Sequence, residues 1–206
     1  MGFHTSVLLR EVTDLLQVKK DEKYIDATLG GGGHAKEIIK RGGIVLGIDL
    51  DQDAIDYVSE NLKSQISSCK LKIVRGNFIE IEKIARSQDF EKVAGIIFDL
   101  GVSSYQLEKT ERGFSFLREG PLDMRMDPSA GSGQAVTARD IVNLTSKNEL
   151  YEIFSKLGEE HNARAVSSAI VRARRVKAIL TTEDLARVVE GSFGFKKKAP
   201  DYIRAK

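Results

Sequence analysis

Apolar residues fall in short runs that alternate with helix-length segments through the first half of the chain. We predict strands at residues 24–27, 44–49, 71–74 and 93–100, with helices between them at 35–41, 53–65 and 78–87. A further amphipathic helix is predicted before the first strand, at residues 7–16. Strands separated by helices favour a parallel sheet with right-handed crossovers, so the predicted fold class is α/β.

The pattern changes after Asp99. Residues 101–133 are rich in glycine, serine and proline and show no periodicity, which is typical of a functional loop or a linker. Helical patterns then occupy residues 137–144, 147–157, 159–176 and 182–189. Thr137, Ser146 and either Thr181 or Thr182 are expected to cap three of these helices. We therefore expect an α/β domain over residues 1–133 and an all-α domain over 134–206.

The composition is that of a folded globular protein, with 41% apolar and 30% charged residues. No apolar run approaches the roughly 20 residues that span a bilayer, and the amino terminus does not have the pattern of a signal peptide. We therefore expect a cytoplasmic protein with no membrane contact. Cys69 is the single cysteine and has no metal-ligand neighbour in the sequence, so we expect no disulfide and no metal.

The chemistry begins with a glycine-rich segment after the first predicted strand, where Asp26 precedes four consecutive glycines. Such a loop lets backbone amides approach a nucleotide-like ligand. Gly30, Gly32 and Ala35 fit the dinucleotide fingerprint, whereas an acid before the glycines is the pattern of S-adenosylmethionine sites. Because a carboxylate would repel a pyrophosphate, Asp26 favours S-adenosylmethionine, whose methionine end carries positive charge. The alternative is that Asp26 only hydrogen-bonds the turn.

A second acid, Asp49, ends the next apolar run. An acid about 20 residues past the glycines is placed to accept hydrogen bonds from ribose hydroxyls. Together the two acids predict a nucleoside cofactor.

Positive charge gathers near the carboxyl end of the chain, although the net charge is only +2. Residues 161–182 contain no acid. A basic stripe on a helix suits a phosphate backbone, and the alternative is a solvated helix face. The basic residues of this stretch are Arg164, Arg172, Arg174, Arg175 and Lys177.

Seven segments in fixed order closely resemble the MraW/RsmH family of bacterial small-subunit ribosomal RNA methyltransferases. They are HTSVLL (4–9), DATLGGGGH (26–34), GIDLD (47–51), GNF (76–78), DLGVSS (99–104), ERGFSF (111–116) and GPLDMRMD (120–127). The resemblance implies S-adenosylmethionine-dependent methylation of the exocyclic N4 amine of a cytidine in small-subunit rRNA. It also implies a class I, Rossmann-like methyltransferase sheet with an inserted all-α domain. The substrate would be the rRNA itself or the assembled 30S subunit.

The resemblance also assigns residues to roles. The cofactor contacts it implies, with Asp26 added from the loop pattern, are Asp26, Gly32, Gly33, His34, Asp49, Phe78, Asp99 and Gln106. Asp99 is the first candidate for accepting a hydrogen bond from the reacting amine, and Asp123 and Arg125 are the next candidates for substrate contact. For that pair the alternative is a salt bridge that staples the loop. The basic stretch would bind rRNA.

Two departures from the family pattern stand out. Tyr105 replaces the usual proline, which leaves the loop less rigid. The family also continues beyond the position of Lys206 with a stretch that adds further strands, so we expect a carboxyl-terminally truncated chain with an incomplete, four-stranded sheet. The 93–100 strand would then form an exposed edge, open to self-association or strand exchange. The competing functions are a catalytically inactive cofactor- or RNA-binding fragment and, in another class, an NAD-dependent oxidoreductase.

Overall fold

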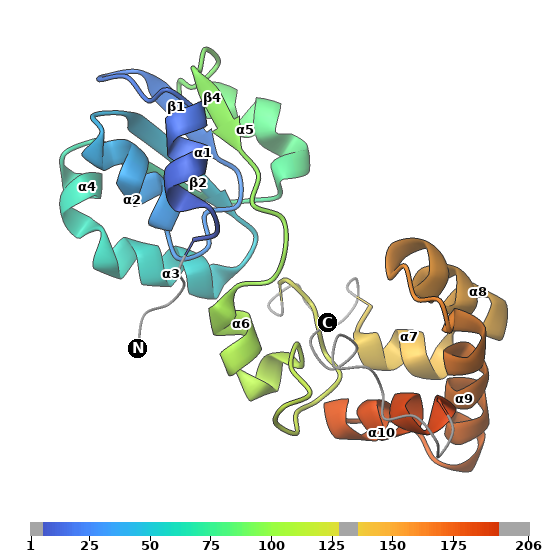
Figure 1. Cartoon of the computed structure of the whole chain (residues 1–206). Coiled ribbons are helices and arrows are strands. Elements are labelled where there is room, and N and C mark those ends of the chain that lie inside the picture. The colour runs from blue at the N-terminus through green and yellow to red at the C-terminus, as the bar shows by residue number, and fades with distance from the viewer. Residues whose placement is uncertain (1–5, 128–135, 194–206) are drawn as a thin grey trace. The chain divides into compact units, whose positions relative to one another are not determined.

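The computed structural model describes residues 6–127 and 136–193, except the side chains of Ser104 and Tyr105. The chain divides into two compact units, Met1–Tyr105 (unit 1) and Gln106–Lys206 (unit 2). Figure 1 shows a sheet with helices in unit 1 and helices with loops in unit 2.

Unit 1 contains one parallel sheet of four strands in the order β3-β2-β1-β4. The strands are β1 (Lys23–Asp26), β2 (Ile44–Asp49), β3 (Leu71–Arg75) and β4 (Gly95–Ile97). The predicted α/β class is confirmed, and so is the position of the fourth strand at an edge. This strand is shorter than the predicted 93–100. β1, the strand that pairs with β4, ends at Asp26. Beyond Ile97 the backbone N–H of Asp99 therefore donates to the side chain of Thr28 and not to a strand backbone.

One helix of unit 1 precedes the first strand and the others lie in the connections between strands, as expected. They are α1 (Leu9–Leu15), α2 (Gly33–Lys40), α3 (Gln52–Asn61), α4 (Lys63–Ser67), the 3₁₀ turn η1 (Phe78–Glu80) and α5 (Ile81–Ser87). The single helix predicted at 53–65 is interrupted at Leu62, whose backbone (φ −116°, ψ 31°) leaves the helical region. Leu62 is buried in the core, so packing against the sheet holds it out of the helix.

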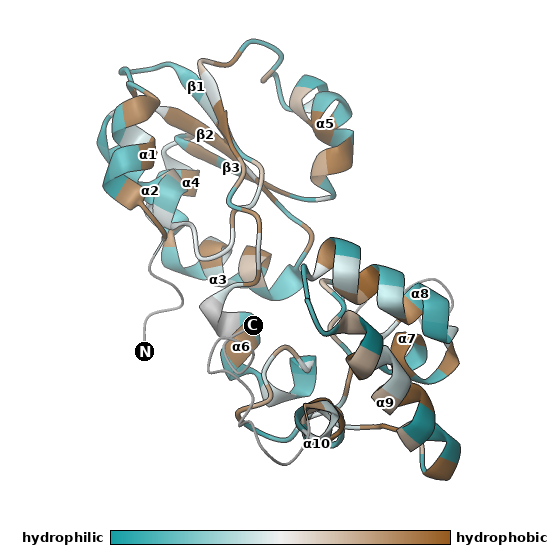
Figure 2. Ribbon diagram, turned by 45° about the vertical axis from the view of Figure 1, so that its right-hand side comes forward, coloured by the Kyte–Doolittle hydropathy of each residue, from teal (hydrophilic) through white to brown (hydrophobic). Residues whose placement is uncertain are grey.

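Both faces of the sheet are covered, which explains why its strands are mainly apolar. On one face Tyr24 and Val45 pack with Ile38 of α2 and Val58 of α3. On the other, Ile25, Leu46 and Ile48 pack with Ile84 and Ala85 of α5 and with Phe90. Figure 2 shows the corresponding hydrophobic colour on the strands and on parts of the flanking helices.

The strand order reverses direction between β1 and β4. β2 pairs with one side of β1, and β3 pairs with the far side of β2. After α5, β4 pairs with the other side of β1. In open α/β sheets this switch point opens a crevice at the carboxyl ends of the strands, where ligands bind. Unit 1 therefore directs attention to the residues that follow β1, β2 and β4.

Unit 2 is built from α7 (Ala138–Leu144), α8 (Lys147–Glu152), a π-helical turn η3 (Ile153–Leu157), α9 (Ala163–Val176) and α10 (Thr182–Ser192). Leu150 and Ile170 are buried at the centre of its core. The predicted caps are confirmed. Thr137 and Ser146 form capping boxes with Asp140 and Glu149, and Thr181, rather than Thr182, caps α10.

The segment before α7 is more ordered than its composition predicts. The expectation that residues 101–133 lack regular structure was wrong for α6 (Ser104–Glu108) and for the 3₁₀ turn η2 (Thr110–Arg112). Leu122 is buried in the helical core, and its backbone bonds to Leu180 and Arg139. Residues 106–127 therefore belong with the helices. The expected domain boundary at 133/134 falls within 128–135, outside the described residues.

Candidate cofactor site and basic helix

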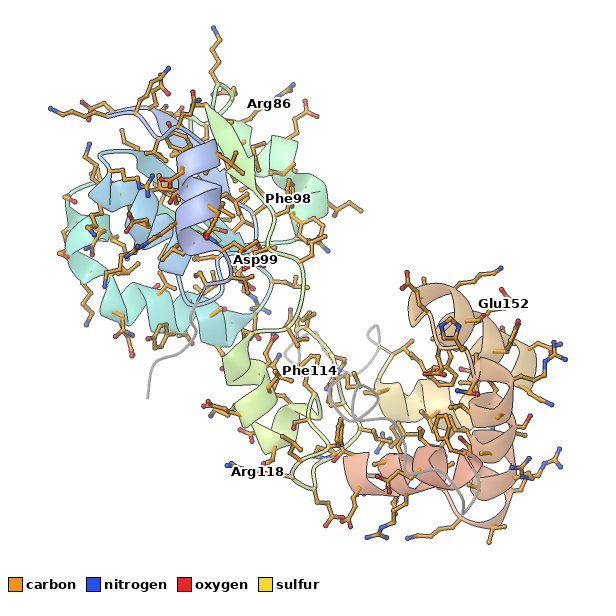
Figure 3. The ribbon with its side chains drawn as sticks, in the orientation of Figure 1. Arg86, Phe98, Asp99, Phe114, Arg118 and Glu152 are labelled. Atoms are coloured by element: carbon orange, nitrogen blue, oxygen red, sulfur yellow. The ribbon has the colours of Figure 1, made fainter. Side chains whose placement is uncertain are left out.

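Three carboxylates lie at neighbouring strand ends in unit 1. Asp26 ends β1, Asp49 ends β2, and Asp99 follows β4. Figure 3 labels Asp99 in the segment that leaves the carboxyl end of β4. Parallel strands bring these ends to one edge of the sheet, so three acids that are distant in sequence share one region.

Asp49 joins the glycine loop to the end of β2. Its Oδ2 accepts a hydrogen bond from the Gly30 N–H at 2.7 Å, and its Oδ1 accepts one from the Asp51 N–H at 2.9 Å. Burial raises the pKa of Asp49, and the two N–H donors oppose that shift. Each carboxylate oxygen has a second lone pair, so the side chain can still accept a ligand hydroxyl.

Asp26 is 1% exposed and only partly satisfied. Its Oδ1 accepts from the Thr28 N–H at 3.3 Å, so the turn hydrogen bond considered from the sequence is present. Its Oδ2 has no hydrogen-bond partner among the described residues. Burial raises the pKa of Asp26 to about 7; the N–H of Thr28 opposes the shift, and the charges of Asp49 and Asp99 add to it.

Asp99 is positioned by residues from elsewhere in the chain. Its backbone N–H donates to Thr28 Oγ1 at 2.7 Å, and its Oδ2 lies 3.9 Å from His34 Nδ1. His34 Nε2 lies 3.2 Å from the carbonyl oxygen of Val7, so Nε2 carries the hydrogen of this contact. No partner for the His34 ring could be named from the sequence, because Val7 approaches it only in the folded chain.

The two glycines expected to contact the cofactor have distinct roles in the loop. Gly32 precedes α2 with φ +73°, a conformation that side chains rarely adopt. At Gly33 a Cβ atom would lie 2.1 Å from Ser6 Oγ. The space beside Gly33 is thus occupied by the chain's own amino-terminal segment, which also contacts His34 through Val7.

Phe78 and Gln106 lie in different units. The Phe78 ring is 42% exposed and meets Phe98 edge to face, with the ring centroids 5.7 Å apart. Phe98 was not singled out in the sequence, where it reads as part of a strand. Gln106 belongs to unit 2, where it is buried and its Nε2 lies 3.6 Å from Met126 Sδ. Its part in a cofactor site stays a prediction.

Asp123 and Arg125 form a bidentate pair within unit 2. Arg125 Nε and Nη2 donate to the two oxygens of Asp123 at 2.8 and 2.7 Å. These hydrogen bonds lower the pKa of Asp123. Buried Arg112 also donates to the carbonyl oxygens of Arg125 and Met126. The loop is therefore stapled, which is the alternative weighed for this pair.

The basic residues around α9 divide into two groups. Arg164, Arg172 and Arg175 are exposed and fall on one face by helical spacing. Arg174 points elsewhere, because its Nη1 donates to the Val142 carbonyl oxygen of α7 at 2.7 Å. Lys177 is exposed just past the helix end. The Arg164 guanidinium lies 5.5 Å from the centre of the Tyr151 ring.

The strand order, the glycine loop and the acids at the strand ends together define an α/β protein of the Rossmann-like methyltransferase class. Comparison with known families identifies the family within this class. A model described as the MraW methylase family matches residues 1–205, and the chain belongs to that family.

Curated relatives agree with this assignment. The chain is 42% identical over 207 residues to the ribosomal RNA small subunit methyltransferase H of Lachnospira eligens, covering 97% of this chain and 64% of that protein. It is 45% identical to the proteins of the same name from Halothermothrix orenii and Persephonella marina, with 91% and 90% of this chain and 59% and 62% of theirs covered. The chain thus spans about three-fifths of the length of these relatives.

One solved structure is similar more distantly. It is the C-terminal domain of precorrin-6Y C5,15-methyltransferase from Rhodobacter capsulatus, with 18% identity and a TM-score of 0.39 over 50% of this chain and 56% of that one. Along residues 6–127 and 136–193, no helix is both long and apolar enough to cross a bilayer.

Proposed function

We propose that this chain carries the cofactor site of an S-adenosylmethionine-dependent enzyme that methylates the exocyclic N4 amine of a cytidine in small-subunit rRNA. The observation that carries the proposal is the group of three acids, Asp26, Asp49 and Asp99, at the switch point of a sheet in the MraW methylase family. The relatives' names supply the rRNA substrate.

The charge of the site favours this cofactor over a dinucleotide. Three carboxylates suit the cationic methionine end of S-adenosylmethionine and would repel the pyrophosphate of NAD. Asp49 would accept the ribose hydroxyls, and the Gly32–His34 turn would face the methionine end. Phe78 would lie beside the adenine. Bound S-adenosylmethionine supplies an electrophilic methyl group.

Asp99 is the residue we propose to act on the substrate. The N4 amine must point its lone pair at the methyl carbon and must lose one proton as the new N–C bond forms. A carboxylate that accepts a hydrogen bond from the amine orients the nitrogen, stabilises its developing positive charge and can take up the proton that the amine loses. Thr28 holds the backbone of Asp99, so its carboxylate starts from a fixed position. Asp123 and Arg125 would shape the substrate loop as a pair.

Calorimetric titration with S-adenosylmethionine tests the cofactor assignment. Asp49→Asn keeps the side-chain shape but only one of the two acceptor oxygens, so it should weaken binding by about tenfold or more, in a variant whose fold is checked by circular dichroism. Asp56→Asn, the same change on an exposed face of α3, is the matched control and should bind as the wild type does. A folded chain that binds RNA but not S-adenosylmethionine would favour the inactive-fragment alternative, and binding of NAD instead would favour an oxidoreductase.

We further propose that the exposed face of α9 contacts the rRNA backbone, in free rRNA or in the assembled 30S subunit. Its support is the set Arg164, Arg172 and Arg175 on one face, with no acid in the helix. Reversing the charge at Arg172 and Arg175 should weaken binding of an rRNA fragment. The slope of log affinity against log salt should fall by about 0.7–0.9 per lost phosphate contact.

The matched control for RNA binding reverses Lys83 and Arg86 to Glu, which makes the same charge change at two exposed positions of α5 in unit 1. Equal losses for the two variants would indicate a general charge effect and contradict the assignment to α9.

A further inference from the structure

We propose that Asp26 exchanges a proton for a cationic ligand: its carboxyl group is neutral in the free protein and loses its proton when S-adenosylmethionine binds. The inference rests on the proposed function, because it concerns the same site. It adds that the uncharged thioether product, S-adenosylhomocysteine, binds with less proton release.

The geometry begins with the position of Asp26 in the sheet. β1 lies between β2 and β4, so Asp26 lies between the strands that lead to Asp49 and Asp99. Asp26 is the buried member of this group, and its Oδ2 lacks a hydrogen-bond partner among the described residues. A buried carboxylate next to two others is costly to ionise, because burial removes water and the neighbours repel the added charge.

The surroundings of Asp26 contribute little that offsets this cost. The N–H groups of Thr28 and Ala35 favour the ionised form but are outweighed by burial. Asp49 faces it from β2 and Asp99 from the end of β4, and both raise its pKa. On α2, His34 Nδ1 lies 3.9 Å from Asp99 Oδ2. The pKa of Asp26 consequently reaches about 7.

A cation placed among these acids reverses the balance. Its charge stabilises the ionised form of Asp26, lowers its pKa and expels the proton. If the pKa falls by about two units, affinity for the cation rises about tenfold as pH increases from roughly 6 to 8. S-adenosylmethionine carries a sulfonium charge that S-adenosylhomocysteine lacks. The preference for S-adenosylmethionine over its product should therefore increase with pH.

The protonation state of Asp26 in the free protein can be measured without any ligand. The carboxyl carbon of Asp26 is followed by NMR as a function of pH and assigned with Asp26→Asn. We expect its titration midpoint near pH 7 in the folded chain. A midpoint near 4, the ordinary range for aspartate, would overturn the inference.

Proton release is then counted by calorimetry at about pH 6.5, in buffers that differ in ionisation enthalpy. Wild type and Asp56→Asn should release a large fraction of one proton on binding S-adenosylmethionine and less on binding S-adenosylhomocysteine. Asp26→Asn should bind more weakly, and with that release lost. Release that persists in Asp26→Asn and disappears in His34→Gln would assign the exchange to His34 and overturn the inference.

The two proposals fail in different ways. If S-adenosylmethionine binds but proton release does not depend on Asp26, this inference is contradicted and the proposed function is not. Absence of binding by a folded wild-type chain contradicts the proposed function, and the exchange with it.

Discussion

Side chains near the expected cofactor site in unit 1 also accept hydrogen bonds from the backbone. Asp49 receives the N–H groups of Gly30 and Asp51, and Thr28 receives that of Asp99. The sequence predicted Asp49 from its distance to the glycine loop. It offered no signal for Thr28, because a threonine in a loop is common and its partner is 71 residues away.

Asp26 should make stability depend on pH. Its folded pKa of about 7 lies above its ordinary value of 3.8, so the folded chain holds a proton that the unfolded chain has released. The contribution of Asp26 to stability is therefore fully present below the ordinary pKa and is lost as pH rises through the folded value. Between about pH 5 and 8 the loss of this contribution should be roughly 2–3 kcal/mol. Urea unfolding of wild type and Asp26→Asn at both pH values checks this, since the variant lacks the decline; parallel curves would contradict it.

Thr28 should position Asp99 through its hydroxyl group. Thr28→Val keeps the shape but leaves the Asp99 N–H without its acceptor, at a cost of about 1–3 kcal/mol. Thr28→Ser retains the oxygen and serves as the control. We expect valine, and not serine, to lower stability in urea unfolding and to weaken S-adenosylmethionine binding. Equal behaviour of the two variants would show that the hydrogen bond is unimportant.

At the scale of elements, α9 combines a structural and an exposed set of arginines. Its sequence predicts one basic stripe, but the packing of α9 against α7 turns Arg174 to the Val142 carbonyl oxygen. That carbonyl lies in the last turn of α7, where helix carbonyls lack intrahelical partners. Arg174 therefore stabilises a helix end, while Arg164, Arg172 and Arg175 remain available to a partner.

This division predicts opposite effects for two arginines on the same helix. Arg174→Ala should reduce the free energy of unfolding by about 1–2 kcal/mol, because a charge-assisted hydrogen bond to a helix end is lost. Arg172→Ala should change stability by less than about 0.5 kcal/mol and should weaken RNA binding more. Urea unfolding and RNA titration of both variants test this, and the reverse pattern would refute it.

At the scale of the whole molecule, the sheet ends in an apolar edge. No strand among the described residues pairs with the outer side of β4, where Ile96 and Phe98 are 42% and 49% exposed. Unpaired edges of this kind attract other strands. The relatives are longer than this chain, so the edge need not have the same surroundings in them.

We expect this chain to self-associate through β4 with increasing concentration. Ile96→Lys places a charge on the edge and should shift sedimentation toward monomer. Leu144→Lys makes the same kind of change at an exposed apolar side chain of α7, in unit 2, and should leave the distribution unchanged. A distribution that is monomeric at all concentrations, or that responds equally to both variants, would contradict association through β4.

The sequence by itself determined the elements and their class, because local rules govern them. Apolar runs predicted every strand, the glycine loop predicted the start of α2, and Thr137, Ser146 and Thr181 predicted helix caps. Motifs in fixed order predicted the family, which the comparison confirms. These features depend on neighbours within a few residues, so they can be read along the chain.

Only the tertiary structure decided which distant groups meet. The approach of Asp26, Asp49 and Asp99 depends on strand order, and the partners of His34 and Arg174 depend on how helices pack. Burial likewise raises the pKa of Asp26. The short strand and the glycine loop on either side of it in the sequence do not indicate that burial. Contacts between segments far apart in the chain, and the removal of water that accompanies them, leave no local pattern, so they emerged only from the folded arrangement.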